Sequence, residues 1–219
     1  MSNPIKDKFI EHMELFGLTK ETQKGYISAV RCLATHYHTS PEHLSNDQVR
    51  DYFRHLLVEK KLAHSSCKAY LAGITYFYRH ICGREVDDRF GLPPRPLGKK
   101  LPAVLSMEEV HRLLRCIDNL KHRVILKTIY SAGLRVGEVI KLKPKHIESD
   151  SSRMMIRIER GKGGKDRYAV LSKHLLDELR IYWQEYKPLE WLFPGKNQKK
   201  HLSYTQARSY FVKAKKKPV

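Results

Sequence analysis

Cysteine is scarce in this chain, and its spacing matches no metal-binding pattern. The four cysteines include no pair separated by two residues, so a structural zinc site is not indicated. Three of them fall within helical patterns, where a free thiol behaves as a small hydrophobic group. We therefore expect reduced thiols, no bound metal and a cytoplasmic location. The four residues are Cys32, Cys67, Cys82 and Cys116.

Long apolar runs are also missing from the sequence. No stretch approaches the roughly 20 consecutive apolar residues that a membrane-spanning helix needs. The first residues, Met-Ser-Asn-Pro-Ile-Lys-Asp, do not resemble a secretory signal. We predict no membrane partner.

Acidic residues are few compared with basic ones. The chain has 23 Asp and Glu against 42 Lys and Arg, a formal net charge of +19, and no acidic residue follows Glu190. An excess this large predicts attraction to a polyanion such as a nucleic acid. The simpler interpretation, a basic surface without a nucleic-acid role, is disfavoured because a phosphate-type motif accompanies the charge. A hydrophobic content of 41% indicates a folded chain.

The first part of the chain predicts a bundle of helices. Apolar residues recur at helical spacing over 5–16, 26–37, 49–57 and 70–81. Thr19 is a candidate N-cap, Ser45 and Gln48 match a capping box, and Gly17 can end the first helix in a left-handed conformation. Each helix has one apolar face, and the four faces can be buried only against one another.

A proline-rich segment divides the chain. Gly91–Pro102 contains four prolines, which disfavour helix and central strand and indicate an extended linker. We therefore predict a helical domain over 1–86, a linker over 87–103 and a second domain over 104–219.

The second domain is predicted to be helical around a small hairpin. Ser106 and Glu109 match another capping box, and helical spacing continues over 124–129, 175–183 and 207–211. Residues 153–160 and 167–171 alternate like strands around a glycine-rich turn. Trp191–Gly195 reads as a buried apolar turn. The fold class is mainly α with a small β-hairpin or sheet (α+β).

Two short motifs carry the chemical signal. Ser131–Glu138 reads Ser-Ala-Gly-Leu-Arg-Val-Gly-Glu, which places Arg135 just beyond a glycine break at a helix junction. A guanidinium can bind two non-bridging phosphate oxygens at once. Gly161–Lys165 reads Gly-Lys-Gly-Gly-Lys, and Lys162 could give a proton to a leaving oxygen. Alternatively, Arg135 only caps a helix or pairs with Glu138, and Lys162 is an ordinary hairpin tip.

The Ala-Gly-Leu-Arg-x-x-Glu run and the Gly-Lys-Gly turn resemble the tyrosine recombinase (phage integrase) family, and the chain looks Xer-like over nearly its whole length. The resemblance implies a DNA-clamping core-binding (SAM-like) bundle followed by part of a catalytic domain. It implies DNA strand cleavage and rejoining through a 3′-phosphotyrosine, without a cofactor or metal. It assigns charge stabilisation to Arg135 and structural support to Glu138. It assigns protonation of the leaving 5′ oxygen to Lys162, with Lys165 as the near competitor.

One departure from the family pattern matters. None of the 12 histidines is followed three residues later by arginine, and no tyrosine matches the nucleophile. Tyr204 and Tyr210 come late in the chain but follow no such motif. We expect a truncated recombinase that cannot cleave DNA alone unless a partner supplies the missing tyrosine.

The expected partners are double-stranded DNA and, on that DNA, a full-length recombinase or further copies of this chain. Competing hypotheses are a non-catalytic DNA-binding competitor or mobile-element remnant, and a basic RNA-binding protein. The candidate DNA-binding residues are Lys24, Arg31, Lys68, Arg79, Lys99, Lys165 and Arg167.

Overall fold

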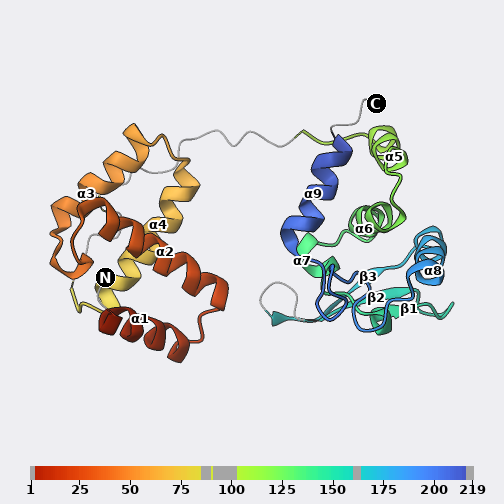
Figure 1. The fold of residues 1–219 in the computed structure, drawn as a ribbon, viewed down its shortest axis with the longest axis horizontal. Coiled ribbons are helices and arrows are strands. Elements are labelled where there is room, and N and C mark those ends of the chain that lie inside the picture. The colour runs from red at the N-terminus through yellow and green to blue at the C-terminus, as the bar shows by residue number, and fades with distance from the viewer. Residues whose placement is uncertain (1–2, 85–89, 91–102, 160–163, 216–219) are drawn as a thin grey trace. The chain divides into compact units, whose positions relative to one another are not determined.

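The computed structural model describes residues 3–84, 90, 103–159 and 164–215. The chain forms two compact units, Met1–Lys100 and Leu101–Val219 (Figure 1). Helices predominate in both units, and the second unit contains a small antiparallel sheet. The predicted fold class is confirmed. Among the described residues, no helix is both long enough and apolar enough to cross a membrane.

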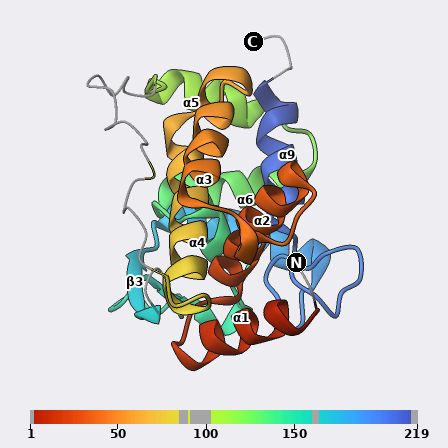
Figure 2. The same cartoon turned by 90° about the vertical axis from the view of Figure 1, so that its left-hand side faces the viewer.

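The first unit is a helical bundle. Helices α2 and α4 pack side by side, and α1 lies across one end of the pair (Figures 1 and 2). Gly73 permits the close approach, because a Cβ added there would lie 2.9 Å from the Tyr26 Cα atom. The elements are α1 (Asn3–Leu15), α2 (Lys20–Tyr37), η1 (Pro41–His43), α3 (Asn46–Arg54), η2 (His55–Glu59) and α4 (His64–His80).

The helix ends in this unit follow the local sequence. Thr19 Oγ1 accepts a hydrogen bond from the Thr22 N–H at 3.3 Å, and Ser45 and Gln48 form the predicted capping box. Gly17 has a φ of +67° beyond the end of α1. The predicted apolar face of α1 was wrong at Phe16. The helix ends at Leu15, and Phe16 is 66% exposed.

Two features of the first unit were not predicted. Helix α3 continues directly into η2, a π-helical turn that widens the helix before Lys60. Phe90, which the sequence placed in the linker, is buried and stacks on Phe53 with ring centroids 6.1 Å apart. The core of the first unit therefore includes a residue from the predicted linker.

The second unit surrounds a three-stranded antiparallel sheet of order β1-β2-β3. The predicted hairpin corresponds to β2 and β3, with Ile156 opposite Ala169 and Ile158 opposite Arg167. Strand β1, which pairs with β2, was not predicted, because it is only two residues long. The elements are α5 (Met107–Arg115), α6 (Leu120–Ser131), α7 (Val136–Val139), η3 (Pro144–His146), β1 (Ile147–Glu148), β2 (Met155–Ile158), β3 (Arg167–Val170), α8 (Lys173–Tyr186) and α9 (Tyr204–Lys215).

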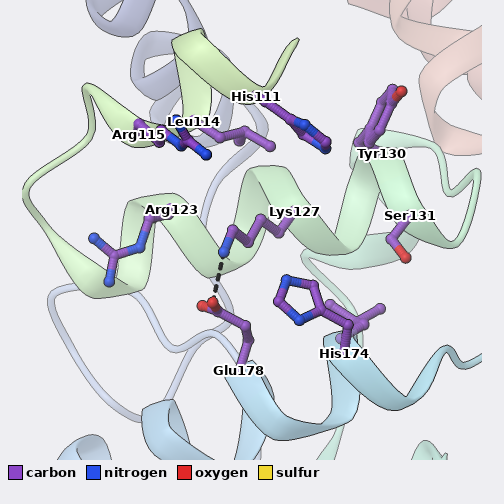
Figure 3. Close-up of a pocket in the computed structure, with 10 residues that line it drawn as sticks. His111, Leu114, Arg115, Arg123, Lys127, Tyr130, Ser131, His174 and Glu178 are labelled. Atoms are coloured by element: carbon purple, nitrogen blue, oxygen red, sulfur yellow. Dashed lines mark hydrogen bonds and ion pairs between the residues drawn. The ribbon is translucent and has the colours of Figure 1, made fainter. Parts of the chain in front are cut away.

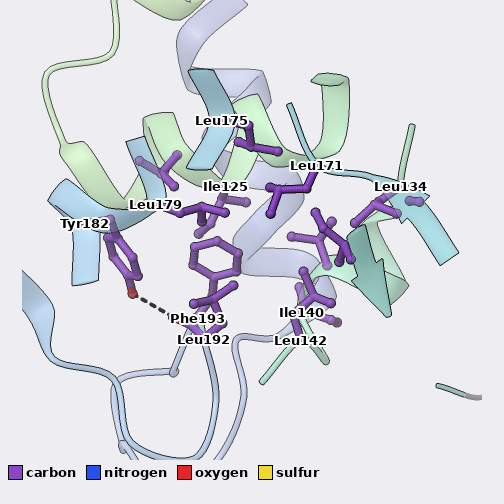
Figure 4. Packing of buried hydrophobic residues seen from close by; sticks show 14 of the residues in the cluster. Ile125, Leu134, Ile140, Leu142, Leu171, Leu175, Leu179, Tyr182, Leu192 and Phe193 are labelled. Carbon is purple, nitrogen blue, oxygen red and sulfur yellow. Dashed lines mark hydrogen bonds between the residues drawn. The ribbon is translucent and has the colours of Figure 1, made fainter. Parts of the chain in front are cut away.

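The core of the second unit lies between one face of the sheet, α6 and α8 (Figure 4). Phe193 is fully buried there, and the Tyr182 hydroxyl donates a hydrogen bond to the Leu192 carbonyl at 2.9 Å. The predicted inner face of α8 was wrong at its last position. Trp183 is 50% exposed, and Tyr182, three residues after Leu179, fills the core in its place.

Candidate functional site

The junction between α6 and α7 presents Arg135. Gly133, with a φ of +59°, lies just after the end of α6, and the Leu134 N–H donates to the Ile129 carbonyl at 3.1 Å. This bond is typical of a Schellman cap. The cap needs a left-handed residue just after the helix, and glycine suits that position because it has no Cβ. Leu134 is buried in the core. The chain is thus anchored immediately before Arg135, whose extended backbone (φ −72°, ψ 149°) begins α7.

Glu138 holds two arginines in one place. One of its carboxylate oxygens accepts hydrogen bonds from the Arg135 backbone N–H and the Arg167 Nη2, both at 2.8 Å. The other oxygen accepts from the Arg135 Nη1 at 2.9 Å. The Glu138 side chain is 8% exposed, whereas that of Arg135 is 61% exposed. The carboxylate is therefore the buried support, and the Arg135 guanidinium is accessible from solvent.

The electrostatics of this cluster favour a bound anion. Burial alone would raise the pKa of Glu138, but hydrogen bonds from Arg167 and from the Arg135 backbone and side chain outweigh burial and lower it. One carboxylate is then shared by two guanidiniums, which leaves a net positive charge. The Arg167 Nε atom is buried and makes no hydrogen bond within the described part of the chain. Guanidinium groups with unused donors suit phosphate oxygens.

The two arms of the hairpin are joined by a third arginine. The Nη2 atom of Arg157 on β2 lies 3.6 Å from a carboxylate oxygen of Glu159 and 3.6 Å from one of Asp166. These two acidic residues stand on opposite sides of the turn. Lys165 is exposed beside Asp166. Lys162 lies outside the described residues, as does Lys99. The structure therefore brings Arg135 and Arg167 together and gives no position for Lys162.

A cavity of about 360 Å³ lies beside Glu138, and sequence reasoning did not single it out. His146, which lines it, is 4% exposed, and its Nδ1 accepts a hydrogen bond from the Lys143 N–H at 3.1 Å. Its Nε2 lies 3.5 Å from a Glu159 carboxylate oxygen. Burial lowers the pKa of His146. The local sequence gave no specific signal for it, because His146 is one of three polar residues between Leu142 and Ile147.

The candidate DNA-binding residues of the first unit divide into two groups. Lys68 and Arg79 on α4 line one shallow cavity of about 260 Å³, together with Tyr76 and His80. Lys24 and Arg31 are exposed on α2, and the Lys24 Nζ atom lies 4.0 Å from a Glu21 carboxylate oxygen. The structure thus gathers Lys68 and Arg79 and places the α2 pair outside that cavity.

Tyr210, one of the two late tyrosines, lies in a partly buried setting. Tyr210 stacks on His122 with ring centroids 3.5 Å apart, and burial raises the pKa of its hydroxyl. A raised pKa makes this hydroxyl a weaker nucleophile near neutral pH. Within residues 3–84, 90, 103–159 and 164–215, no group of three His, Cys, Asp or Glu side chains could hold a metal ion.

Comparisons with known proteins match both units. The family described as "Phage integrase, N-terminal SAM-like domain" matches residues 5–88, and "Phage integrase family" matches residues 103–218. Two candidate integrase/recombinases of Sinorhizobium fredii are 41% and 44% identical, over 88% and 69% of this chain. The chain spans only 62% and 60% of those two proteins. Tyrosine recombinase XerA of Pyrococcus horikoshii is 29% identical over 93% of this chain and 69% of its own length.

Solved structures share the fold at low sequence identity. A lambda integrase tetramer bound to a Holliday junction is 16% identical, with a TM-score of 0.74 over 97% of this chain and 65% of that one. The Tn1549 transposon integrase in complex with transposon right end DNA is 15% identical, with a TM-score of 0.73 over 98% and 79%. The family matches together cover both units of the molecule. The chain therefore belongs to the phage integrase family, the tyrosine recombinases.

Proposed function

We propose that this chain binds double-stranded DNA and acts in site-specific recombination or integration. The observation that carries the proposal is the pair of guanidiniums, Arg135 and Arg167, that the buried Glu138 carboxylate holds together. Family membership supports the same role. The reaction proposed for the whole protein is strand cleavage and rejoining through a 3′-phosphotyrosine.

Arg135 is proposed to bind the phosphate at the exchange point. Its guanidinium can meet two non-bridging oxygens, and it stabilises the negative charge that develops on them in the transition state. Glu138 fixes the guanidinium by a charge-assisted hydrogen bond and is a positioning residue. Lys162 is proposed, from the resemblance alone, to protonate the leaving 5′ oxygen.

We propose that residues 1–219 bind the phosphate without cleaving it. Cleavage by this mechanism needs an activated tyrosine, and no tyrosine in the sequence matches that role. We propose that a further copy or a full-length recombinase on the same DNA is the partner for strand exchange. The lambda integrase structures, which are dimers or tetramers on DNA, support this assembly by analogy.

The remaining basic residues are proposed to position the DNA. The helical domain over 1–86 would clamp the duplex, the linker over 87–103 would contribute Lys99, and 104–219 would carry the phosphate site. Such contacts to the sugar-phosphate backbone set register without reading sequence. The proposed contact residues are Lys24, Arg31, Lys68, Arg79, Lys99, Lys165 and Arg167.

Replacement of Arg135 tests the phosphate site. We expect Arg135→Ala to weaken binding to a duplex oligonucleotide by about tenfold, since one charge-assisted phosphate contact is lost. Arg180→Ala is a matched control. Arg180 has the same 61% side-chain exposure and pairs with an acidic residue three positions away, Asp177. Gel shift gives the affinities, and circular dichroism gives the helical content.

The two arginines must differ for the proposal to stand. Equal affinities for the Arg135→Ala and Arg180→Ala proteins would remove Arg135 from the DNA contact. Loss of helical content in Arg135→Ala would assign the residue a structural role.

Cleavage is tested with a nicked duplex that carries a candidate recombination site. We expect a retained gel shift under native conditions and no covalent protein–DNA adduct on a denaturing gel. An adduct would show that one of the 12 tyrosines of this chain is the nucleophile. The proposal that the chain binds DNA without cleaving it would then be wrong.

A further inference from the structure

A cleft lies between α5, α6 and α8 (Figure 3). Its volume is about 530 Å³, within the range of small-molecule pockets. None of Arg135, Glu138 and Arg167 lines it. The cleft is therefore distinct from the proposed phosphate site, and the family resemblance assigns it no role.

The residues of α6 run along the cleft as a single stripe. Arg123, Lys127 and Tyr130 are four and three positions apart, so they share one face of the helix. The rise of an α-helix places the first and last of them about 10 Å apart along the axis. Helix α5 contributes His111 and Arg115, also four positions apart, to the facing wall.

This geometry separates charge from rings. Figure 3 shows the guanidiniums of Arg115 and Arg123 at one end of the cleft, and the rings of His111, Tyr130 and His174 toward the other. The ring-lined end thus differs in chemistry from the cationic end.

Ion pairing leaves the cationic end positive. Lys127 and Glu178 form an ion pair at 2.5 Å with side chains 21% and 18% exposed, so these two charges offset each other in the middle of the cleft. Arg123 donates through Nη1 to the Ile117 carbonyl at 3.2 Å, which holds its guanidinium in place. Among the residues that line the cleft, Arg115 and Arg123 are the permanent cations that this ion pair does not offset.

The other end suits a planar group. Tyr130 is 51% exposed, although it is a large aromatic residue on a helix that is otherwise well packed. Leu114 and Leu175, which are buried side chains, contribute apolar surface to the lining. Exposed aromatic rings are platforms on which nucleobases stack, whatever the base.

We propose that this cleft binds a nucleotide, with its phosphate between Arg115 and Arg123 and its base against Tyr130 and the two histidine rings. Two sources share this chemistry: a free nucleotide, and an unpaired nucleotide of a DNA strand. An acidic peptide would satisfy the guanidiniums but would bring no planar group to the ring-lined end.

The probe for this site is dATP, titrated calorimetrically into the full chain. We expect dATP to bind more tightly than deoxyadenosine or inorganic phosphate, because only dATP engages both ends. Arg115→Ala should weaken dATP binding by about tenfold. Arg112→Ala should not, and it is a matched control: Arg112 is exposed in the same last turn of α5 but does not line the cleft.

Further variants separate the two ends and the two sites. Tyr130→Ala should weaken dATP binding about tenfold through lost stacking, whereas Tyr168→Ala, at a similarly exposed ring outside the cleft, should not. Arg135→Ala should keep the preference for dATP over inorganic phosphate, because that preference needs both ends of the cleft and Arg135 does not line it. A failure of the proposed DNA-phosphate site would therefore leave this result unchanged.

Competition identifies the source. If a single-stranded oligonucleotide displaces dATP and also binds Arg115→Ala more weakly, the cleft takes a nucleotide of a strand. If the oligonucleotide does neither, the ligand is a free nucleotide. The proposal is overturned if dATP does not bind at millimolar concentration or if Arg115→Ala and Arg112→Ala bind it equally. It is also overturned if a glutamate-rich peptide, and not dATP, binds in a manner that depends on Arg115.

Discussion

Glu138 sets the geometry of the candidate phosphate site at the residue scale. It is the buried member of a three-residue cluster, and both arginines are oriented by its oxygens. The sequence predicted a supporting role for Glu138, and its hydrogen bonds to Arg135 and Arg167 agree with that role. The sequence left open that Arg135 only pairs with Glu138. The ion pair does form, but it leaves the Arg135 guanidinium largely exposed and accessible to a phosphate.

The lowered pKa of Glu138 predicts a pH-dependent contribution to stability. Its folded-state pKa lies below the ordinary value of 4.5, so the carboxylate stabilises the fold above that pH and loses this effect as the pH falls through the lowered pKa. We expect Glu138→Gln to cost about 1–3 kcal/mol at neutral pH. The difference from the unmodified protein should shrink below pH 4.

Urea unfolding at pH 7 and at pH 3.5 measures this change. A penalty for Glu138→Gln that is equal at the two pH values would mean that the lost acceptor oxygen, and not the charge, accounts for the role of Glu138.

At the scale of the elements, two glycines determine how helices end and cross. Gly133 closes α6 in a left-handed conformation and turns the chain toward Arg135. Gly73 lets α4 approach α2 so closely that no Cβ would fit beside Tyr26 without movement. The first requirement is local to the backbone, and the second exists only because two helices meet.

Replacement of Gly133 tests the local requirement. We expect Gly133→Ala to destabilise the protein by about 1 kcal/mol, because alanine is strained at positive φ even though no atom lies within 4 Å of the added Cβ. Gly137→Ala is the control, since Gly137 lies within α7, also in open space, and has no positive φ. Thermal unfolding followed by circular dichroism measures the change. The midpoint temperature should fall for Gly133→Ala and not for Gly137→Ala. Equal midpoints would show that the conformation of Gly133 carries no strain for alanine.

Replacement of Gly73 tests the packing requirement. We expect Gly73→Ala to cost about 1–3 kcal/mol through overpacking against Tyr26. Gly25→Ala on α2 meets nothing within 4 Å and should instead stabilise its helix by up to about 1 kcal/mol. Chemical unfolding of the two proteins should give shifts of opposite sign. A stabilising Gly73→Ala would mean that α2 and α4 can move apart without cost.

Charge is the property that acts at the scale of the whole molecule. A formal net charge of +19 is spread over both units, and it includes the candidate DNA-contact residues on α2 and α4. A DNA duplex that is bound by several Lys and Arg side chains releases counterions from its phosphates.

This charge predicts a steep dependence of DNA affinity on salt. We expect the affinity for duplex DNA to fall by at least about tenfold between 50 and 200 mM salt, as it does for proteins that neutralise several phosphates. Fluorescence anisotropy with a labelled duplex gives the slope. An affinity that stays flat over this range would contradict a DNA clamp built from phosphate contacts.

Much of the fold could be read from local sequence. The caps at Thr19, Ser45 and Ser106 and the glycine break at Gly133 depend on side chains and φ values within a few residues, so their patterns are visible in the chain itself. The hairpin strands were predicted for the same reason, because side chains alternate between two faces of a strand.

Features that depend on distant contacts were missed. Phe16 and Trp183 fit the apolar repeat of their helices but face solvent, and Phe90 is buried from within a stretch that was predicted to be a linker. A periodic pattern gives the face of a helix only to within a residue, and what packs against that face decides which side chains are buried.

The sequence by itself determined the family and the helical fold class, and it predicted a phosphate-binding role for Arg135, because these rest on short motifs and local periodicity. Only the tertiary structure decided that Arg167 and Arg135 share the carboxylate of Glu138, which lies 29 positions before Arg167. It also decided that α5, α6 and α8 enclose a second cleft. Both depend on side chains that are far apart in the chain and adjacent only after the core has packed, and no local pattern records such a meeting.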